Sequence, residues 1–456
     1  MSLICGHLLW NYICKISPEQ TCIFDNSTLY NAPFQTHREE ETMDVKEHIV
    51  SRGLVFPEYE GGAINSVMAG LVSLLNGHSR TLFPSKPLSE RYTNWIAAEI
   101  DRVALIILDG LGYNMLREYI DDHRDTFFAE FERQGRLLPL TSVAPSTTVV
   151  AMTSIWYSAP PSIHGMAGFE IFLKEIGCTA NMLRFSPVAA SAPGLLESYG
   201  LKAEELVKLG GIDKLIGESD VKVFSLLNRF IVDSPLSRAI HKGIHKKIGI
   251  INMWDEFYLL GETLTKESPP FIAVAYWPAL DSLAHHYGPS HEVWQDEMET
   301  ISRGLEKLIK NLRDDARKRT LFVITADHGF VHSPPSNSVN IMEIKGISES
   351  LLMLPTGESR FTYLTVKNGK MEGTIEILRD ALGKDFLVIP SREAFEDGLF
   401  GPPVPKATFL DRIGDIIVTP TGNKNIVWNN EENELIGRHG GLTQREMLVP
   451  FLAAVF

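Results

Sequence analysis

The sequence contains little cysteine and no apolar stretch long enough to cross a membrane. Only four of its 456 residues are cysteine, and their spacing fits neither a zinc ribbon nor a redox motif. We therefore expect no disulfide framework. The longest apolar runs, Phe271–Leu280 and Met447–Phe456, each contain a proline and fall short of the roughly 20 residues that span a bilayer. The sequence thus predicts no membrane span.

Basic residues are also scarce relative to acidic ones. The chain has 43 Lys and Arg against 57 Asp and Glu, which gives a formal net charge of −14. Polyanion binding needs clustered Lys and Arg, so polymeric nucleic acid is not an expected partner. The short basic stretch His241–Lys247 is too small to reverse this, and we interpret it as a solvated helix face. Excess acid can also mean carboxylates gathered around metal ions, which composition alone does not separate from solubility charge.

The first 42 residues lack the regular pattern of the rest of the chain. Residues 1–16 have no basic start, and His7 and Asn11 interrupt their apolar stretch, so they do not fit a signal peptide. We interpret residues 1–42 as an irregular N-terminal extension and expect the core to occupy residues 43–456. A cytoplasmic location is the default expectation.

Several short β-branched runs end at Asp, His or Gly. They are Val103–Leu108, Phe271–Tyr276 and Leu321–Thr325, and Met447–Phe456 is a further run at the C-terminus. Apolar runs without alternation are typical of strands buried on both faces of a parallel sheet. Val293–Arg313 has the apolar spacing of a helix. The pattern therefore predicts a three-layer α/β/α sandwich around a mostly parallel sheet.

Two long intervals interrupt this alternation. Residues 333–437 include the strand-like Phe361–Val366 and the helix-like Glu372–Leu382, and we expect them to form an inserted cap or subdomain over the site. Met182–Ile250 is expected to be mostly helical, without an obvious catalytic motif. Ligands of such sheets bind beyond the carboxyl ends of the strands, where three of the chemically interesting clusters lie.

Four clusters carry possible metal ligands. Asp281 and His285 are four residues apart, so one helical turn can direct both at the same point. Asp327 and His328 follow a predicted strand, and joint ligation by neighbours needs a sharp turn, which Gly329 permits. Asp109 and His439 each stand beside glycine. Taken singly, each cluster has an ordinary surface or turn interpretation; their order and their strand-end positions favour a shared site.

A run of hydroxyl residues precedes an apolar helical pattern. Ser and Thr are preferred helix N-caps, so Thr147 and Thr148 have a purely structural interpretation. The same geometry favours a nucleophile, because the helix N-terminus stabilises an alkoxide and attracts phosphate. A coordinated divalent cation would further promote deprotonation.

In order, these motifs resemble the alkaline phosphatase superfamily, and most closely its type I phosphodiesterase/nucleotide pyrophosphatase family. The resemblance spans about residues 103–456, and its most specific part is DSLAHHYGP followed by ADHG. The matching segments are Leu108–Gly110 (LDG), Pro145–Thr148 (PSTT), His164-Gly165, Asp281–Pro289 (DSLAHHYGP), Ala326–Gly329 (ADHG) and Arg438–Gly441 (RHGG).

The resemblance implies a two-metal phosphoric ester hydrolase. Thr148 corresponds to the nucleophile, a ligand of the first metal, with Thr147 as the alternative register. Two divalent ions are implied, zinc by resemblance, with manganese or iron also compatible with carboxylate and imidazole ligands. The implied ligands are Asp109, Asp327 and His328 for the first ion and Asp281, His285 and His439 for the second.

The implied substrate is a small phosphate ester or diester, such as a nucleotide. A phosphomonoesterase, a phosphonate-cleaving hydrolase and a non-catalytic binding protein with the same fold are the alternatives. The oligomeric state is not visible in the sequence. His164 matches a family position that is not a ligand, and we interpret it as structural. Further side chains near the motifs could face solvent, support the ligands, stack on a base or belong to the core: His286, His291, His332, Tyr113, Trp156 and Trp277.

Overall fold

The computed structural model describes residues 44–76, 81–190, 192–404, 407–428 and 434–456. The predicted extension over residues 1–42 lies outside the described residues. Among the helices that are described, none is both long enough and apolar enough to cross a membrane.

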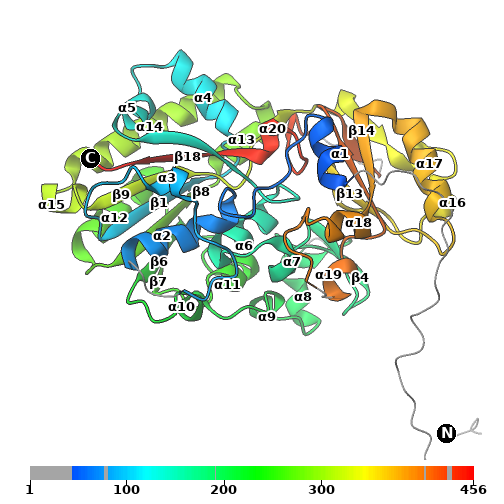
Figure 1. The fold of residues 1–456 in the computed structure, drawn as a ribbon, viewed down its shortest axis with the longest axis horizontal. Coiled ribbons are helices and arrows are strands. Elements are labelled where there is room, and N and C mark those ends of the chain that lie inside the picture. Colours follow the sequence, from blue (N-terminus) through cyan, green and yellow to red (C-terminus); the bar gives the residue numbers. More distant parts are fainter. Residues whose placement is uncertain (1–43, 77–80, 191, 405–406, 429–433) are drawn as a thin grey trace, which may run out of the picture. The chain divides into compact units, whose positions relative to one another are not determined.

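One seven-stranded sheet has the strand order β2-β18-β9-β1-β8-β6-β7 (Figure 1). The neighbouring strands β9, β1, β8, β6 and β7 run parallel, whereas β18 is antiparallel to both β9 and β2. The prediction of a mostly parallel sheet is therefore confirmed. The strands are β1 (Arg102–Leu108), β2 (Arg136–Thr141), β6 (Lys222–Asn228), β7 (Lys246–Ile250), β8 (Phe271–Trp277), β9 (Thr320–Thr325) and β18 (Leu448–Ala454).

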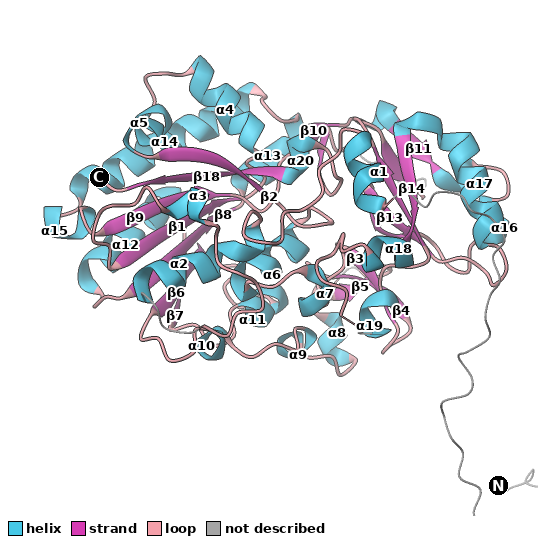
Figure 2. Cartoon of the chain, viewed as in Figure 1, coloured by secondary structure: helices cyan, strands magenta, loops and turns pink. Residues whose placement is uncertain are grey.

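The central strands form where the sequence has continuous apolar runs. All seven residues of β1 and all six of β9 are buried, as expected for strands covered on both faces. Helices surround the sheet (Figure 2); α12 packs on β8 and against α14, and α2 packs on β8 and against α6. The longer helices are α2 (Val67–Asn76), α4 (Tyr113–Asp122), α5 (Phe127–Gln134), α6 (Thr148–Tyr157), α12 (Met253–Lys266), α13 (Ala279–Tyr287), α14 (Glu292–Asn311) and α17 (Met371–Leu382).

The expectation that Met182–Ile250 is mostly helical is wrong. This interval supplies β6 and β7, two parallel strands of the central sheet. In β7 the lysines Lys246 and Lys247 lie on an edge strand, where charge discourages pairing with other chains and hides the strand pattern. The basic stretch is therefore not a solvated helix face. Its first residue, His241, is buried at the end of the short helix α11 (Pro235–Ile240).

A second, antiparallel sheet has the order β14-β15-β13-β12-β3-β4-β5. It joins strands from residues 170–187 to strands from residues 356–420, and it has its own core, to which Leu364, Leu378 and Val418 belong. That residues 333–437 act as a cap stays a prediction. The strands are β3 (Glu170–Leu173), β4 (Cys178–Asn181), β5 (Ser186–Pro187), β12 (Thr356–Glu358), β13 (Phe361–Leu364), β14 (Phe386–Pro390) and β15 (Ile416–Pro420).

Shorter elements complete the described chain. Two further two-stranded ladders pair β10 (Val331–His332) with β17 (Gly437–Arg438) and β11 (Ser338–Asn340) with β16 (Asn425–Val427). The short helices are α1 (Val45–Ser51), α3 (Glu90–Thr93), α7 (Pro161–His164), α8 (Leu195–Ser198), α9 (Ala203–Leu206), α10 (Ile212–Leu215), α15 (Asp314–Arg317), α16 (Ile347–Ser350), α18 (Ser391–Glu396), α19 (Ala407–Leu410) and α20 (Gln444–Met447).

The neighbouring strands β8, β1 and β9 carry the predicted motifs at their carboxyl ends. Asp109 directly follows β1, and Asp327 and His328 follow β9 after one residue. Helix α13, which contains Asp281, begins two residues after β8. Because these strands are parallel neighbours, their ends lie at one edge of the sheet, where such folds bind ligands.

Candidate metal centre

Asp109, Asp327 and His328 form the first candidate ligand group. The Nε2 atom of His328 lies 3.5 Å from Asp109 Oδ1 and 3.3 Å from Asp327 Oδ2. All three side chains are buried, and their ligand atoms are close enough together to hold one ion. Glycine is required at position 329 because of close packing and not because of a left-handed backbone. A Cβ there would lie 2.0 Å from the carbonyl oxygen of Arg445.

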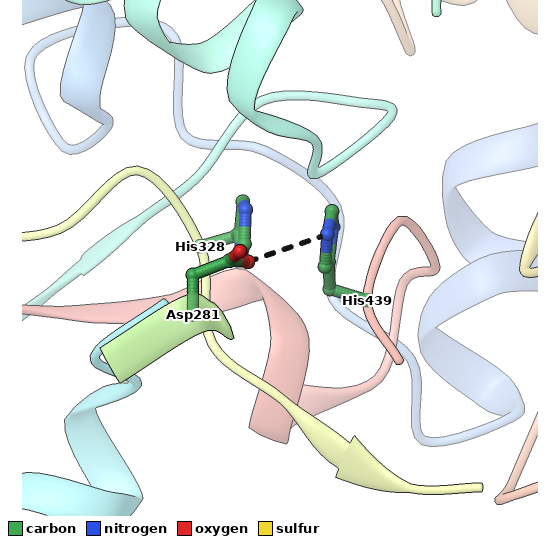
Figure 3. Close-up of side chains that lie close together, drawn as sticks. All are labelled: Asp281, His328 and His439. Carbon is green, nitrogen blue, oxygen red and sulfur yellow. Dashed lines mark ion pairs between the residues drawn. The ribbon is translucent and has the colours of Figure 1, made fainter. Parts of the chain in front are cut away.

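Asp281, His285 and His439 are the second predicted group; the ligand atoms of Asp281 and His439 lie close to those of His328, and His285 lies beside Asp281. Asp281 Oδ1 lies 3.5 Å from Nε2 of His285, one turn along α13, and 3.7 Å from Nε2 of His439. Figure 3 shows the Asp281 carboxylate directed at the rings of His328 and His439. The His328 and His439 rings are stacked with centroids 3.7 Å apart, so the two groups adjoin. The fold thus brings all six predicted ligands together.

Each of the three histidines is oriented by a backbone carbonyl. Nδ1 of His285 lies 3.0 Å from Gly437 O, Nδ1 of His328 lies 3.2 Å from Gly329 O, and Nδ1 of His439 lies 3.1 Å from Ser146 O. A carbonyl oxygen only accepts hydrogen bonds, so each Nδ1 donates. The Nε2 lone pair of each ring is then available to bind a cation. A hydrogen bond from the other ring nitrogen to a carbonyl oxygen is the usual support of metal-binding histidines.

The three aspartate carboxylates lie close together without hydrogen-bond donors for all their oxygens, an arrangement that suits a bound cation. Asp109 Oδ1, Asp281 Oδ1 and Asp327 Oδ2 are buried without a hydrogen-bond partner among the described residues. Burial, together with the nearby Asp327 carboxylate, raises the pKa of Asp109 and of Asp281 well above the ordinary value. Buried oxygens of this kind are costly unless paired, and divalent cations reverse the repulsion among them. The residues present therefore fit a metal centre.

The two candidate threonines face different partners. Thr148 is the first residue of α6, and its Oγ1 lies 3.2 Å from His328 Nε2. Thr147 is the N-cap residue, and it lines a cavity together with Glu358 of β12. Only Thr148 therefore places its hydroxyl against a member of the first ligand group.

Two aromatic side chains at the centre carry no sequence motif. The Tyr276 hydroxyl donates a hydrogen bond to Asp109 Oδ2. Phe330 is fully buried with its ring 4.8 Å from His285, 5.7 Å from His328 and 5.1 Å from His439, measured between centroids. Tyr276 lies near the end of β8, and Phe330 follows the Asp327–Gly329 turn after β9. By sequence alone, a single aromatic residue at either position is not distinguishable from a core residue.

A buried ion pair supports the loop that carries His439. Arg360, at the start of β13, binds Glu446 through Nε at 2.5 Å and Nη2 at 2.7 Å, and both side chains are fully buried. Glu446 also accepts hydrogen bonds from the Gly441 amide and the Thr443 hydroxyl. The second sheet thus fixes the backbone on one side of the RHGG motif.

The remaining residues singled out in the sequence lie outside the ligand groups. His164 is buried, with Nε2 2.9 Å from Ser154 Oγ and Nδ1 accepting from the Met166 amide, which agrees with a structural role. Trp277 donates its indole N–H to Glu297. Trp156 is buried and lines a cavity beside Thr148. The exposed side chains are His286, His291 and His332.

The chain matches the family model described as type I phosphodiesterase / nucleotide pyrophosphatase over residues 103–185 and 221–442. All six candidate ligands and Thr148 fall within these ranges. Among curated proteins, no sequence matches this chain.

Solved structures of low sequence identity share the fold. An inactive variant of murine ectonucleotide pyrophosphatase / phosphodiesterase 5 in complex with AMP has a TM-score of 0.57 at 16% identity, covering 78% of this chain and 88% of that one. Phosphonoacetate hydrolase from Sinorhizobium meliloti 1021 in complex with phosphonoformate has a TM-score of 0.57 at 18% identity, with 78% and 90% covered. The fold and the family match agree with the resemblance seen in the motifs. This chain belongs to the type I phosphodiesterase / nucleotide pyrophosphatase family of the alkaline phosphatase superfamily.

Proposed function

We propose that this protein hydrolyses small phosphate esters or diesters, with Thr148 as nucleophile and two divalent metals as cofactors. The observation that carries the proposal is that five of the predicted ligands gather in two adjoining groups with His285 beside Asp281, and that the Thr148 hydroxyl lies 3.2 Å from Nε2 of His328. The structural relative that binds AMP is an inactive variant with a threonine replaced by alanine, which supports a threonine nucleophile.

The first metal would be held by Asp109, Asp327 and His328, and the second by Asp281, His285 and His439. Carboxylate and imidazole ligands without thiolate suit zinc, manganese or iron, and family membership favours zinc. When bound, such ions neutralise phosphate charge and make a coordinated hydroxyl more acidic. At the N-terminus of α6, Thr148 also lies where the helix dipole favours negative charge.

The reaction is a double displacement at phosphorus. The Thr148 oxygen attacks, the bond between phosphorus and the leaving oxygen breaks, and the leaving group departs as an alcohol after taking up the proton that Thr148 lost to solvent. Water then attacks the phosphothreonine, which restores the Thr148 hydroxyl and releases the phosphate product.

Phosphonate cleavage is the second candidate activity. It is favoured by the likeness to phosphonoacetate hydrolase, which covers 78% of this chain. Turnover of bis-p-nitrophenyl phosphate, p-nitrophenyl phosphate and phosphonoacetate by the metal-loaded protein ranks the three reaction classes. We expect the diester to be cleaved fastest.

Metal dependence is tested on the same assay. Removal of metal with a chelator should abolish turnover, and about two equivalents of zinc, manganese or iron per chain should restore it. Purified protein that contains less than one metal per chain and is unaffected by the chelator would refute the proposal.

A further inference from the structure

A cavity of about 460 Å³ adjoins the candidate metal centre on the side of Thr147. His285 and His439, both of the second predicted ligand group, border it. The remaining wall comes mainly from β3, β4, β5, β12 and β16. The volume is in the range of small-molecule sites, so the cavity is large enough for one organic group of a substrate.

The position of this cavity suits the leaving group of the proposed reaction. In an in-line displacement, the bond to the leaving oxygen breaks on the side of phosphorus opposite the attacking oxygen. The Thr148 hydroxyl adjoins His328 of the first ligand group, whereas the cavity is bordered by the second group. Thr148 itself borders a different cavity of about 320 Å³, which is mostly apolar and which no lysine or arginine of the described chain lines.

Arg438 brings a buried positive charge to the cavity on the Thr147 side. It lines this cavity and is only 3% exposed. Its Nε atom donates to the Ser333 carbonyl oxygen at 3.0 Å, and its Nη1 atom lies 3.5 Å from Ser359 Oγ. Because Ser359 lines the cavity as well, the Nη1 edge of the guanidinium lies at the cavity wall. Both hydrogen-bond partners are neutral, so neither compensates the charge.

No carboxylate of the described residues forms an ion pair with Arg438. The charged neighbour that acts on it is Arg360, a second cation, which is itself paired with Glu446. A buried charge is costly unless an opposite charge lies beside it. An anion in the cavity would supply that charge.

The other charged side chains of the wall have different surroundings. Arg184 is exposed, so water already solvates its charge. Glu358 lies beside the second ligand group, with Oε2 4.0 Å from Nδ1 of His439. Glu170 has an interaction partner of its own. Arg438 is therefore the buried cation of this wall that a bound anion would neutralise.

We propose that Arg438 makes this protein selective for substrates whose leaving group carries an oxyanion of its own, such as a carboxylate. The inference rests on the proposed function. A guanidinium matches the geometry of an oxyanion and binds it through charge-assisted hydrogen bonds. A neutral leaving group of the same size would leave Arg438 buried without a counter-charge, so the selectivity follows the charge of the leaving group and not its size.

The test varies the charge of the leaving group and keeps its size nearly constant. Methyl 3-carboxyphenyl phosphate and methyl 3-carbamoylphenyl phosphate release 3-hydroxybenzoate and 3-hydroxybenzamide, which differ by one charge. A carboxylate is used because a second phosphate would itself be a cleavable ester. For the metal-loaded protein, kcat/KM should be at least about tenfold higher for the carboxyphenyl ester, the usual effect of a hydrogen bond between charged groups. Equal values would overturn the proposal.

Three variants assign this preference to Arg438. The intrinsic reactivities of the two esters are the same for every variant, so a change in their kcat/KM ratio reports on the protein. Arg438→Met should lower the ratio at least about tenfold. Arg438→Lys keeps the charge and should retain part of the preference. Arg445→Met is the matched control, because Arg445 is 46% exposed, pairs with Glu118 and does not line the cavity, so the ratio should stay unchanged.

The ratio also distinguishes selectivity from a merely structural role. If Arg438 only supports the fold or the His439 loop, its loss lowers both rates together and leaves the ratio unchanged, which would overturn the proposal. Should Arg438→Met fail to fold, the ratios of the wild-type protein and of Arg438→Lys decide. A ratio in Arg438→Lys equal to that of the wild type would contradict recognition by the guanidinium.

Binding of the released alcohols separates this proposal from the proposed function. In calorimetry, 3-hydroxybenzoate should bind the metal-loaded protein at least about tenfold more tightly than 3-hydroxybenzamide, and Arg438→Met should abolish the difference. A difference that persists in Arg438→Met would show that the metals bind the carboxylate and would overturn the proposal. Arg438-dependent binding of the benzoate without hydrolysis of any ester would refute the proposed function and keep the anion site. Hydrolysis without charge preference in either assay would refute the anion site and keep the function.

Discussion

The two ligand groups of the candidate metal centre are built in different ways. Asp109, Asp327 and His328 follow two hydrogen-bonded parallel strands, so the central sheet alone brings them together. His439 comes from a loop more than 150 residues after Asp281, and that loop is tied to the second sheet through Arg360 and Glu446. The first group is therefore a property of the sheet, whereas the second depends on a buried polar network at a distance from the ligands.

Replacement of the two neighbouring threonines, one at a time, should produce the largest difference in activity between any two variants. Thr148→Ala should lower kcat by at least about a thousandfold, because it removes the proposed nucleophile. Thr147→Ala should cost less than about tenfold, since it is the Thr148 hydroxyl that lies against His328. Kinetics on bis-p-nitrophenyl phosphate and metal analysis check this, with two metals per chain expected in both variants. Near-normal activity of Thr148→Ala would contradict the assignment.

Loss of the buried ion pair should weaken the second group selectively. Arg360→Met leaves the Glu446 carboxylate buried and unpaired, which should cost about 3–5 kcal/mol in the free energy of unfolding. The loop with His439 should loosen, and metal content should fall from two ions per chain toward one. Urea unfolding and elemental analysis measure the two effects.

Two controls accompany this variant. Arg303→Met removes an exposed pair with Glu299 and should cost less than about 1 kcal/mol. Thr443→Val removes one hydrogen bond to Glu446 and keeps the ion pair, so it should give a milder form of the same defect if Arg360→Met does not fold. Equal loss of both metals in Arg360→Met or in Thr443→Val would contradict the separate construction of the two ligand groups.

Loss of one hydroxyl should weaken the first group. Tyr276→Phe removes the donor to Asp109 and should lower metal affinity about 10–100-fold, the usual cost of losing a group that supports a ligand. Competition with a chelator measures it. Tyr363→Phe is the matched control, because its buried hydroxyl donates to the Ala167 carbonyl instead. An equal loss of affinity in the control would show that the effect is not local to Asp109.

Metal binding should release protons, and this is the smallest expected effect. The pKa values of Asp109 and Asp281 are raised by burial, so their carboxyl groups retain protons above the ordinary range near pH 4 and lose them when a cation binds. Burial lowers the pKa of His285 to about 4 and that of His439 well below its ordinary value, so these rings contribute none near neutral pH.

Calorimetry in buffers of different ionisation enthalpy counts the released protons. The number should be largest at acidic pH and should decrease as the pH rises, because the pKa values of Asp109 and Asp281 are raised by burial. Release that instead follows the titration of free histidine near pH 6.5 would contradict the assigned protonation states.

Sequence patterns predict the fold best where the chain is buried on both faces. The runs in β1, β8 and β9 have no polar face, so their strand assignment is unambiguous. Strand β7 was hidden because its edge position permits lysines, and the interval around it resembled helix. The candidate ligands were recognisable because their spacing and order form a motif. Tyr276 and Phe330 form none, so only their contacts mark them.

By itself the sequence determined the mostly parallel character of the central sheet, the family and the set of candidate metal ligands, because each of these is encoded in local composition and spacing. Tertiary structure alone decided which threonine faces His328, how Arg360 holds the His439 loop, and that an apolar and a charged cavity meet at adjacent residues. These features join segments far apart in the chain, and no local pattern records which distant side chains will pack together.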